Sequence, residues 1–209
     1  GDRMPQSRRY KKKKSAGKAI LAWIIVLAIL AAGVFVFVSV FYEDAKKKLD
    51  EMNYPRTYST YVEKAAKDYD LDPALIYAVI HTESGFDPKA ESGVGAKGVM
   101  QMMPSSFEWL QEQRGCAGQY TEDDLFDPEI CIDYGSYLLK YFYDYYGTER
   151  SAIAAYNAGF VVSDWLNDTN YSSDGKNLDS IPYPETENYV DKVESAKEMY
   201  IKLYYSQSN

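Results

Sequence analysis

The spacing of hydrophobic residues divides this chain of 209 residues into two regions of different character. Residues 19–42 form one apolar run of 24 residues without a charge. A helix that crosses a bilayer needs about 20 such residues, so we predict a single N-terminal transmembrane helix. Beyond residue 42, apolar residues recur every three or four positions, and no segment alternates convincingly with period two. This pattern predicts an all-α fold for the rest of the chain.

Start and stop signals place the helices that follow residue 56. Asp72 and Asp127 each offer an N-cap oxygen directly before a proline, and glycines stand after the expected helix ends. Thr60 and Ser105 each have a glutamate three residues later, which is the spacing of a capping box. The predicted helices cover residues 60–70, 72–84, 128–146, 149–158 and 185–204, with one more that begins at Ser105, and the predicted loops are 85–103 and 160–183.

The charges around the apolar run predict the orientation of the chain. Eight basic residues and one acidic residue precede residue 19, and a basic flank favours the cytoplasmic side. We therefore expect a cytoplasmic tail at 1–18, a cell-membrane anchor at 19–42, a charged helical stalk at 43–56 and one extracellular domain at 57–209. A cleaved signal peptide is the alternative. The run is longer than an ordinary signal h-region and no small-residue cleavage site follows it, so an uncleaved anchor is favoured.

The domain beyond the anchor is acidic, with 30 acidic and 15 basic residues after residue 42. We therefore expect no nucleic-acid partner, because phosphate binding needs clustered Lys and Arg. The Lys-rich N-terminus is interpreted as a topology signal and as a contact for anionic lipids of the cytoplasmic membrane.

Cys116 and Cys131 are the only cysteines. An extracellular compartment permits a disulfide between them, and the closed loop would contribute on the order of 3 kcal/mol in the chain-entropy model. Two unpaired thiols are the alternative, since the sequence does not show whether the two Cα atoms approach each other. Two cysteines and one histidine are too few for a structural zinc site, so we expect none.

Glu83 is the residue whose surroundings suggest chemistry. It lies about two helical turns after Ile76, and so continues the apolar stripe of Ile76 and Val79. Burial raises the pKa of a carboxylate, as does a position at the negative end of a helix dipole, and Glu83 is therefore a candidate proton donor. The alternative is an ordinary helix-end glutamate in water. His81 points to another side of the helix and is expected to be structural.

Three short motifs follow one another along the chain. The first comprises Glu83–Pro88, Ser92, Gly95–Ala96 and Gly98–Pro104; the second is Ala154–Gly159; the third comprises Ile181–Pro182, Glu185–Thr186 and Tyr189–Val190. Together they resemble the lytic transglycosylase (soluble-transglycosylase-like) family of peptidoglycan-cleaving enzymes, over about residues 58–204. Val99 stands where that family often has Leu, and the cysteine pair and the long loop at 160–183 depart from its simplest members.

The resemblance implies a lysozyme-like, mainly α domain in which Glu83 is the single catalytic acid and base. The implied reaction cleaves the β-1,4 bond between N-acetylmuramic acid and N-acetylglucosamine in glycan strands of peptidoglycan. It forms a 1,6-anhydro product and requires no metal or cofactor. The residues that resemble the family's substrate-binding and supporting positions are Ser92, Gln101, Tyr156, Asn157 and Glu185.

Two other functions stay open at this point. A muramidase of goose-lysozyme type would add water to the same bond, and it would need a second carboxylate about 6.5–9.5 Å from Glu83 if it inverts. Asp87, Glu91 or Glu185 would have to supply that carboxylate. A non-catalytic wall-binding scaffold is the other alternative, although a retained acid with its expected neighbours favours an enzyme. No residue indicates which envelope machinery is served, whether for secretion, conjugation, division or sporulation.

Overall fold

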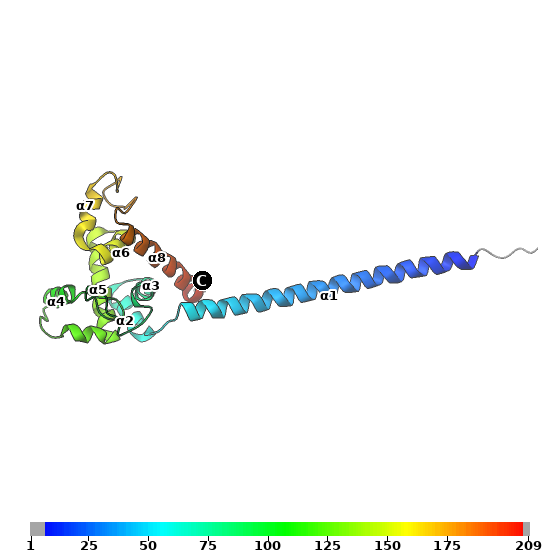
Figure 1. Ribbon diagram of the computed structural model, residues 1–209, viewed down its shortest axis with the longest axis horizontal. Helices are drawn as coiled ribbons and strands as arrows, with labels where there is room; N and C mark the ends of the chain where they lie inside the picture. The colour runs from blue at the N-terminus through cyan, green and yellow to red at the C-terminus, as the bar shows by residue number, and fades with distance from the viewer. Residues whose placement is uncertain (1–6, 207–209) are drawn as a thin grey trace, which may run out of the picture. The chain divides into compact units, whose positions relative to one another are not determined.

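The computed structural model describes residues 7–206, and the chain divides into two units between Asn53 and Tyr54. The first unit contains helix α1 (Ser7–Asn53), blue to cyan in Figure 1, which runs for 47 residues without interruption. From Gly17 onward, α1 is long and apolar enough to cross a membrane, and an 18-residue stretch within it has a mean hydropathy of 3.0. The expected charged stalk is the continuation of this helix, which ends shortly before Pro55.

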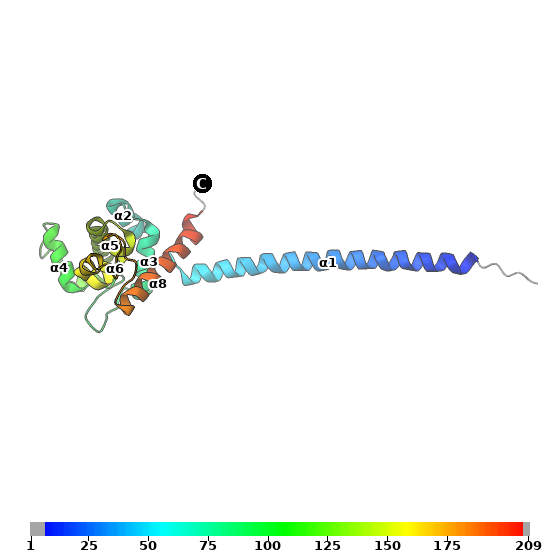
Figure 2. The ribbon, with the colours of Figure 1, turned by 90° about the horizontal axis from the view of Figure 1, so that it is seen from above.

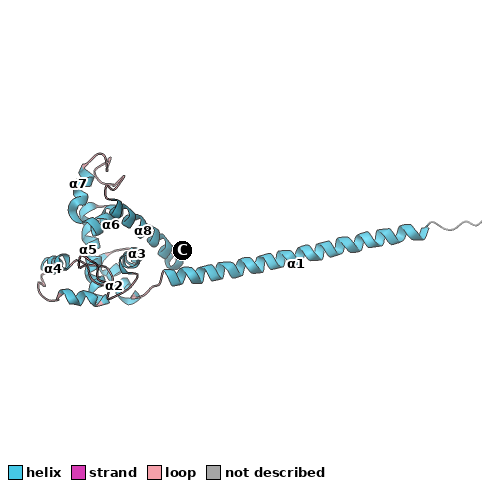
Figure 3. Cartoon of the chain, in the orientation of Figure 1, coloured by secondary structure: helices cyan, strands magenta, loops and turns pink. Residues whose placement is uncertain are grey.

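The second unit consists of helices and loops (Figure 3). Within residues 54–206, the strand-like pairings are two isolated bridges, which join Lys97 to Glu91 and to Met102. The all-α prediction is therefore confirmed for this unit. Its α-helices are α2 (Ser59–Tyr69), α3 (Pro73–Ser84), α4 (Pro104–Gln113), α5 (Pro128–Tyr146), α6 (Glu149–Ala158), α7 (Val162–Asn167) and α8 (Pro184–Tyr200), with the short helical turns η1 (Glu122–Phe126), η2 (Gly159–Val161) and η3 (Ile201–Tyr205).

The capping signals of α3 and α5 are used as predicted. The side chain of Asp72 accepts a hydrogen bond from the Ala74 N–H at 2.9 Å, and Asp127 does the same for Glu129 at 2.8 Å. Gly85 ends α3 with a φ of +58°, a left-handed conformation that glycine adopts without steric cost. These local signals fix where α3 stops, and so they fix the position of Glu83 in its last turn.

Two predicted capping boxes are wrong. Helix α2 begins after Tyr58, which adopts a left-handed φ of +64° and makes no side-chain cap, so Thr60 lies inside the helix. Helix α4 begins at Pro104, one residue before Ser105, because proline is already preset for the first helical position. A capping box does form between Thr121 and Asp124, where it opens the unpredicted turn η1.

The segment 160–183 is only partly a loop. Its first part forms most of η2 and all of α7, and Val162, Trp165 and Leu166 of α7 are buried. Burial of these side chains explains the short helix, whereas the surrounding Asn, Ser, Asp and Gly residues are typical of loops. The predicted loop is therefore wrong for this first part.

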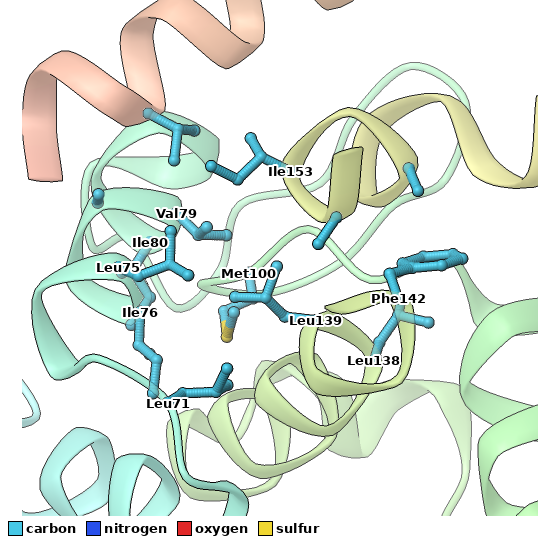
Figure 4. Close-up of a cluster of buried hydrophobic side chains, with 14 of the residues drawn as sticks. Leu71, Leu75, Ile76, Val79, Ile80, Met100, Leu138, Leu139, Phe142 and Ile153 are labelled. Atoms are coloured by element: carbon cyan, nitrogen blue, oxygen red, sulfur yellow. The ribbon is translucent and has the colours of Figure 1, made fainter. Parts of the chain in front are cut away.

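The core surrounds α3, on which every residue from Ala74 to Ile80 is buried. Figure 4 shows Leu75, Ile76, Val79 and Ile80 of α3 facing side chains of α5 and α6. Met100, from the loop after α3, lies between them with no exposed surface. In Figures 1 and 2, α4 lies at one edge of this unit, with α5 and α6 between it and α8.

The first residues of this unit are held by its last helix. The hydroxyl of Tyr200 donates to the carbonyl of Pro55 at 3.1 Å, and that of Tyr204 donates to the carbonyl of Tyr54 at 2.8 Å. The guanidinium of Arg56 lies 5.4 Å from the centre of the Tyr204 ring and forms an ion pair with Glu63. Residues about 150 positions apart therefore close the unit on itself.

The expected disulfide is not formed, because both cysteines are free thiols. The Sγ of Cys131 is buried beside the loop after α3, 3.4 Å from the Met100 N–H. The Sγ of Cys116 lies instead 3.3 Å from the hydroxyl of Tyr134. Each sulfur thus has its own partner, and burial raises the pKa of Cys131 to about 12.

Candidate active site

Glu83 lies in the last turn of α3, at the edge of the core. The residue is partly exposed, and neighbouring atoms desolvate its carboxyl group. This burial raises the pKa of Glu83 to about 7, and a hydroxyl contributed by Tyr189 lowers it by a smaller amount. A carboxyl group with such a pKa can both donate and accept a proton near neutral pH.

The end of α3 is tied to the loop that follows it. The hydroxyl of Ser84 donates to the carbonyl of Val99 at 2.8 Å and accepts from the Phe86 N–H at 3.1 Å. These bonds join the residue next to Glu83 to the segment that contains Gln101. They limit the freedom of the last helical turn, and with it the freedom of the carboxyl group.

Tyr156 reaches the same region from α6. Its hydroxyl donates to the carbonyl of Met100 at 2.9 Å. Burial raises the pKa of Tyr156 well above its usual value, and the nearby Glu83 charge raises it further, so the phenol stays protonated. Tyr156 therefore lies close enough to Glu83 for the two groups to interact electrostatically.

Tyr189 of α8 is a site residue that the sequence analysis did not select. Its side chain is 8% exposed, and within residues 7–206 its hydroxyl makes no hydrogen bond of ordinary geometry. It is close enough to Glu83 to lower the pKa of the carboxyl, and the pKa of Tyr189 is itself raised, first by burial and then by Glu83. The third motif ends in Tyr189–Val190 and so includes this residue, but no sequence pattern indicates that Tyr189 lies beside Glu83.

Gln101 organises the loop between α3 and α4. Its side-chain amide donates to the carbonyls of Ala90 and Gly98, each at 3.0 Å. Its backbone has a φ of +48°, which is uncommon for a residue with a side chain. The described contacts of Gln101 are thus with loop backbone, and they hold the segment to which Tyr156 and Ser84 bind.

The loop between α3 and α4 is also fixed against η1 by a charged residue and a glycine. Lys97 is 7% exposed, and its ammonium group lies 3.0 Å from carboxylate oxygens of both Glu122 and Asp123. Gly98 has a φ of +75°, and a Cβ there would lie 2.0 Å from the carbonyl oxygen of Leu125. No other residue type fits at this position without moving the loop or η1.

A second close approach supports Met100. Gly135 of α5 has no side chain, and a Cβ there would lie 2.6 Å from the sulfur of Met100. Because Met100 can pack directly on the backbone of α5, its carbonyl is held where the Tyr156 hydroxyl binds it. The position of Tyr156 therefore depends on packing between the loop and α5.

The other predicted site residues have contacts of their own. The hydroxyl of Ser92 accepts from the Ala96 N–H at 2.9 Å and closes a turn of the loop. Asn157 is exposed at the end of α6, and its side-chain oxygen accepts from the Thr186 hydroxyl at 2.8 Å, which ties α6 to α8. Glu185 is exposed at the start of α8 and takes no part in these contacts.

The candidate second carboxylates are directed elsewhere. Asp87 accepts from the Lys89 N–H at 2.9 Å, as in a tight turn, and the side chains of Glu91 and Glu185 are exposed. Among the described residues, no second carboxylate contributes to the pKa shift of Glu83. Within residues 7–206, no group of three or more His, Cys, Asp or Glu side chains is placed to hold a metal ion.

The two relatives described next are both named lytic murein transglycosylases. The chain is 32% identical over 146 residues to the soluble lytic murein transglycosylase of Escherichia coli K12, which is 68% of this chain and 23% of that protein. It is 30% identical over 170 residues to the membrane-bound lytic murein transglycosylase C of Actinobacillus succinogenes, which is 71% of this chain and 48% of that protein. The chain therefore spans between about a quarter and about half the length of these relatives.

Solved structures agree in fold. The 70-kDa soluble lytic transglycosylase of E. coli superposes with a TM-score of 0.66 and 28% identity, over 76% of this chain and 26% of that one. An inactive Glu-to-Gln mutant of the lytic transglycosylase Slt from Pseudomonas aeruginosa gives a TM-score of 0.64 and 30% identity, over 73% and 25% of the two chains. The expected lysozyme-like, all-α fold is confirmed.

The family match covers most of the described second unit. Residues 60–178 match the family described as Transglycosylase SLT domain, and they include Glu83, Gln101 and Tyr156. The matched range is more than half of the chain. This protein therefore belongs to the transglycosylase SLT domain family.

Proposed function

We propose that this protein is a lytic transglycosylase that cleaves the glycan strands of peptidoglycan between N-acetylmuramic acid and N-acetylglucosamine. Its relatives are named lytic murein transglycosylases, and one solved relative is a complex with bulgecin A. The observation that carries the proposal is a desolvated glutamate, Glu83, with a pKa of about 7 and with the hydroxyls of Tyr156 and Tyr189 close enough to feel its charge.

The proposed reaction uses one carboxyl group twice. Protonated Glu83 gives its proton to the glycosidic oxygen, the bond to C1 of the muramic sugar breaks, and positive charge develops at C1. The ionised carboxylate then takes the proton of the 6-hydroxyl of the same sugar. The 6-oxygen closes onto C1 and forms the 1,6-anhydro ring, and Glu83 is protonated again. No water is consumed, so the two products together contain the same atoms as the substrate.

Tyr189 and burial favour different states of Glu83. The Tyr189 hydroxyl can donate to the carboxylate, and it lowers the pKa of Glu83, so it favours the ionised form that accepts the 6-hydroxyl proton. Burial favours the protonated form that begins the reaction. The opposed effects keep the pKa near 7, where both steps can proceed. Tyr156 holds the loop carbonyl of Met100.

A goose-type muramidase is the second candidate. It would require a carboxylate that activates water on the opposite face of the sugar. The exposed side chains of Glu91 and Glu185, and the turn contact of Asp87, favour the transglycosylase.

We further propose that α1 anchors the domain to the cytoplasmic membrane. The apolar window of α1 and the membrane-bound relatives support an anchor at residues 19–42. The basic flank favours a cytoplasmic tail at 1–18, a stalk at 43–56 and an extracellular domain at 57–209. The enzyme would then act on peptidoglycan close to the membrane.

The test is mass spectrometry of the fragments that the full chain releases from purified peptidoglycan, beside the Glu83→Gln variant. The proposal expects products that end in 1,6-anhydro-muramic acid from the parent and none from the variant. Reducing-end products, about 18 Da heavier because water is added, would establish the hydrolase instead. Sedimentation with the wall and no released fragment would favour a binding scaffold.

A further inference from the structure

Four aromatic side chains outside the contacts of Glu83 form one cluster, which we call the ring cluster. It consists of Trp109 of α4, Tyr141 and Tyr145 of α5, and Phe160 of η2. The ring of Phe160 is central, with its centre 6.5 Å from Trp109, 6.3 Å from Tyr141 and 5.7 Å from Tyr145. Three elements of the fold therefore contribute to a single aromatic surface.

The ring cluster is open to solvent. Tyr145 is 58% exposed and Phe160 is 49% exposed, while Trp109 and Tyr141 are half-buried. Within residues 7–206, no hydrogen bond uses the indole N–H of Trp109 or the hydroxyls of Tyr141 and Tyr145. Large rings with free polar edges, gathered on one surface, are typical of a binding site rather than of core packing.

The surface beside the cluster has a shape and a charge that restrict the ligand. A shallow hollow of about 330 Å³ lies along α5 and is lined in part by Tyr141 and Tyr145. The charged groups that line it, Lys140 and Asp144, form an ion pair at 2.7 Å and so neutralise each other. Ring faces with a neutral polar rim suit a ligand that combines apolar faces with hydroxyl and amide groups, as sugars do.

The ring cluster is connected to the candidate active site by two segments. Helix α4, which carries Trp109, starts at Pro104, directly after the loop that Gln101 holds. The turn η2, which carries Phe160, starts directly after α6, the helix of Tyr156 and Asn157. Both segments therefore leave the surroundings of Glu83 and meet again at the contact between Trp109 and Phe160.

We propose that the ring cluster is a distal binding site for a sugar of the glycan strand whose scissile bond lies at Glu83. This inference rests on the proposed action on glycan strands, but not on the anhydro chemistry. A long strand would contact both places at once, and a short one only the surroundings of Glu83. The cluster would thus favour long strands over short ones.

The test measures glycan binding without turnover. The full chain in detergent micelles, with Glu83→Gln, is titrated with chitotriose and chitohexaose, two uncharged oligomers of N-acetylglucosamine. Tyr145→Ala and Phe160→Ala each remove one exposed ring of the cluster. The matched control is Tyr143→Ala, because Tyr143 lies in the same turn of α5 and is 37% exposed, but its ring lies outside the cluster. Thermal unfolding of each variant verifies that it folds.

We expect the parent of this series, the Glu83→Gln chain with an intact ring cluster, to bind chitohexaose more tightly than chitotriose. Removal of a ring from the cluster should reduce that preference about five- to tenfold, the usual cost of truncating an aromatic anchor, and the control should change it less than about twofold. The proposal is overturned if the parent binds both oligomers equally, or if Tyr145→Ala and Phe160→Ala behave like Tyr143→Ala. If the chain with its native Glu83 releases no anhydro products from peptidoglycan while the length preference is intact, the proposed chemistry alone is overturned.

Discussion

The buried hydroxyl of Tyr189, on α8, lies close enough to the carboxyl of Glu83, on α3, to lower the pKa of that carboxyl. Within residues 7–206 this hydroxyl has no hydrogen-bond partner of ordinary geometry. A buried hydroxyl without a partner costs free energy, so its position is informative. It is explained if Tyr189 donates to Glu83 whenever that carboxyl is ionised.

The first prediction concerns Tyr189→Phe. Because the hydroxyl lowers the pKa of Glu83, its removal should raise that pKa above about 7 and reduce the rate of the step that needs the carboxylate. In the pH profile of kcat/KM, the apparent pKa assigned to Glu83 should move to higher pH. Tyr183→Phe is the control, since Tyr183 is exposed beside Trp165. An unchanged profile in Tyr189→Phe would show that the two groups do not interact.

The second prediction concerns stability. The pKa of Glu83 is about 7 in the folded chain and about 4.5 as the ordinary value, so the folded state holds its proton more tightly. The stability that this adds is present below pH 4.5 and is lost as the pH rises through 7. Glu83→Gln removes the effect, so the variant should become progressively more stable than the parent over this range, by at most about 3 kcal/mol.

Denaturant unfolding of both chains between pH 4.5 and 8 measures this difference. The difference should stop growing above pH 7.5, because Glu83 is then ionised in both the folded and the unfolded state. Glu91→Gln is the control, because its side chain is exposed. A pH-independent difference between Glu83→Gln and the parent would contradict the raised pKa.

The third prediction concerns Gly98. Alanine there combines a left-handed φ with a Cβ only 2.0 Å from the Leu125 carbonyl oxygen. We expect Gly98→Ala to lose at least about 2 kcal/mol of unfolding free energy, together with activity, because the loop of Gln101 must shift. Gly93→Ala is the control, since that position has an ordinary φ and open space around its Cβ. Its stability should stay within about 0.5 kcal/mol of the parent.

The fourth prediction concerns the two thiols. Cys131 is buried and its pKa is raised to about 12, whereas Cys116 is partly exposed. Iodoacetamide should therefore modify Cys116 alone in the folded chain, and both cysteines after unfolding, without a reducing agent. Modification is counted by mass spectrometry. If no cysteine reacts in the unfolded chain until a reducing agent is added, the disulfide exists and the free-thiol description is wrong.

The sequence predicted α3, α5 and α6 well because each has a capping side chain, a stripe of apolar residues and a terminal glycine. It placed the starts of α2 and α4 within one residue but predicted the wrong caps, because these starts depend on a left-handed tyrosine and on a proline rather than on a capping box. The short helix α7 was missed because three buried side chains, rather than a long periodic pattern, hold it in place.

The candidate site also contains residues that the sequence predicted and residues that it did not. Glu83 was predictable from helical periodicity, since its position follows from the residues of one helix. Tyr189 was not, because its importance depends on how α8 packs on α3, and that contact joins segments about 100 residues apart. Gln101 was selected by resemblance, but the prediction did not include its bonds to the carbonyls of Ala90 and Gly98.

The bonds from Tyr200 and Tyr204 to the carbonyls of Pro55 and Tyr54 also bear on how the domain is made. Ribosomes release the N-terminal part first, so residues 54–56 emerge long before the last helix exists. The segment next to α1 must therefore wait, without its hydrogen-bond partners, until synthesis has passed Tyr204. A chain that stopped before Tyr200 would contain Glu83, Gln101, Tyr156 and Tyr189, yet the carbonyls of Tyr54 and Pro55, at the start of the domain, would lack the hydroxyl groups that bind them.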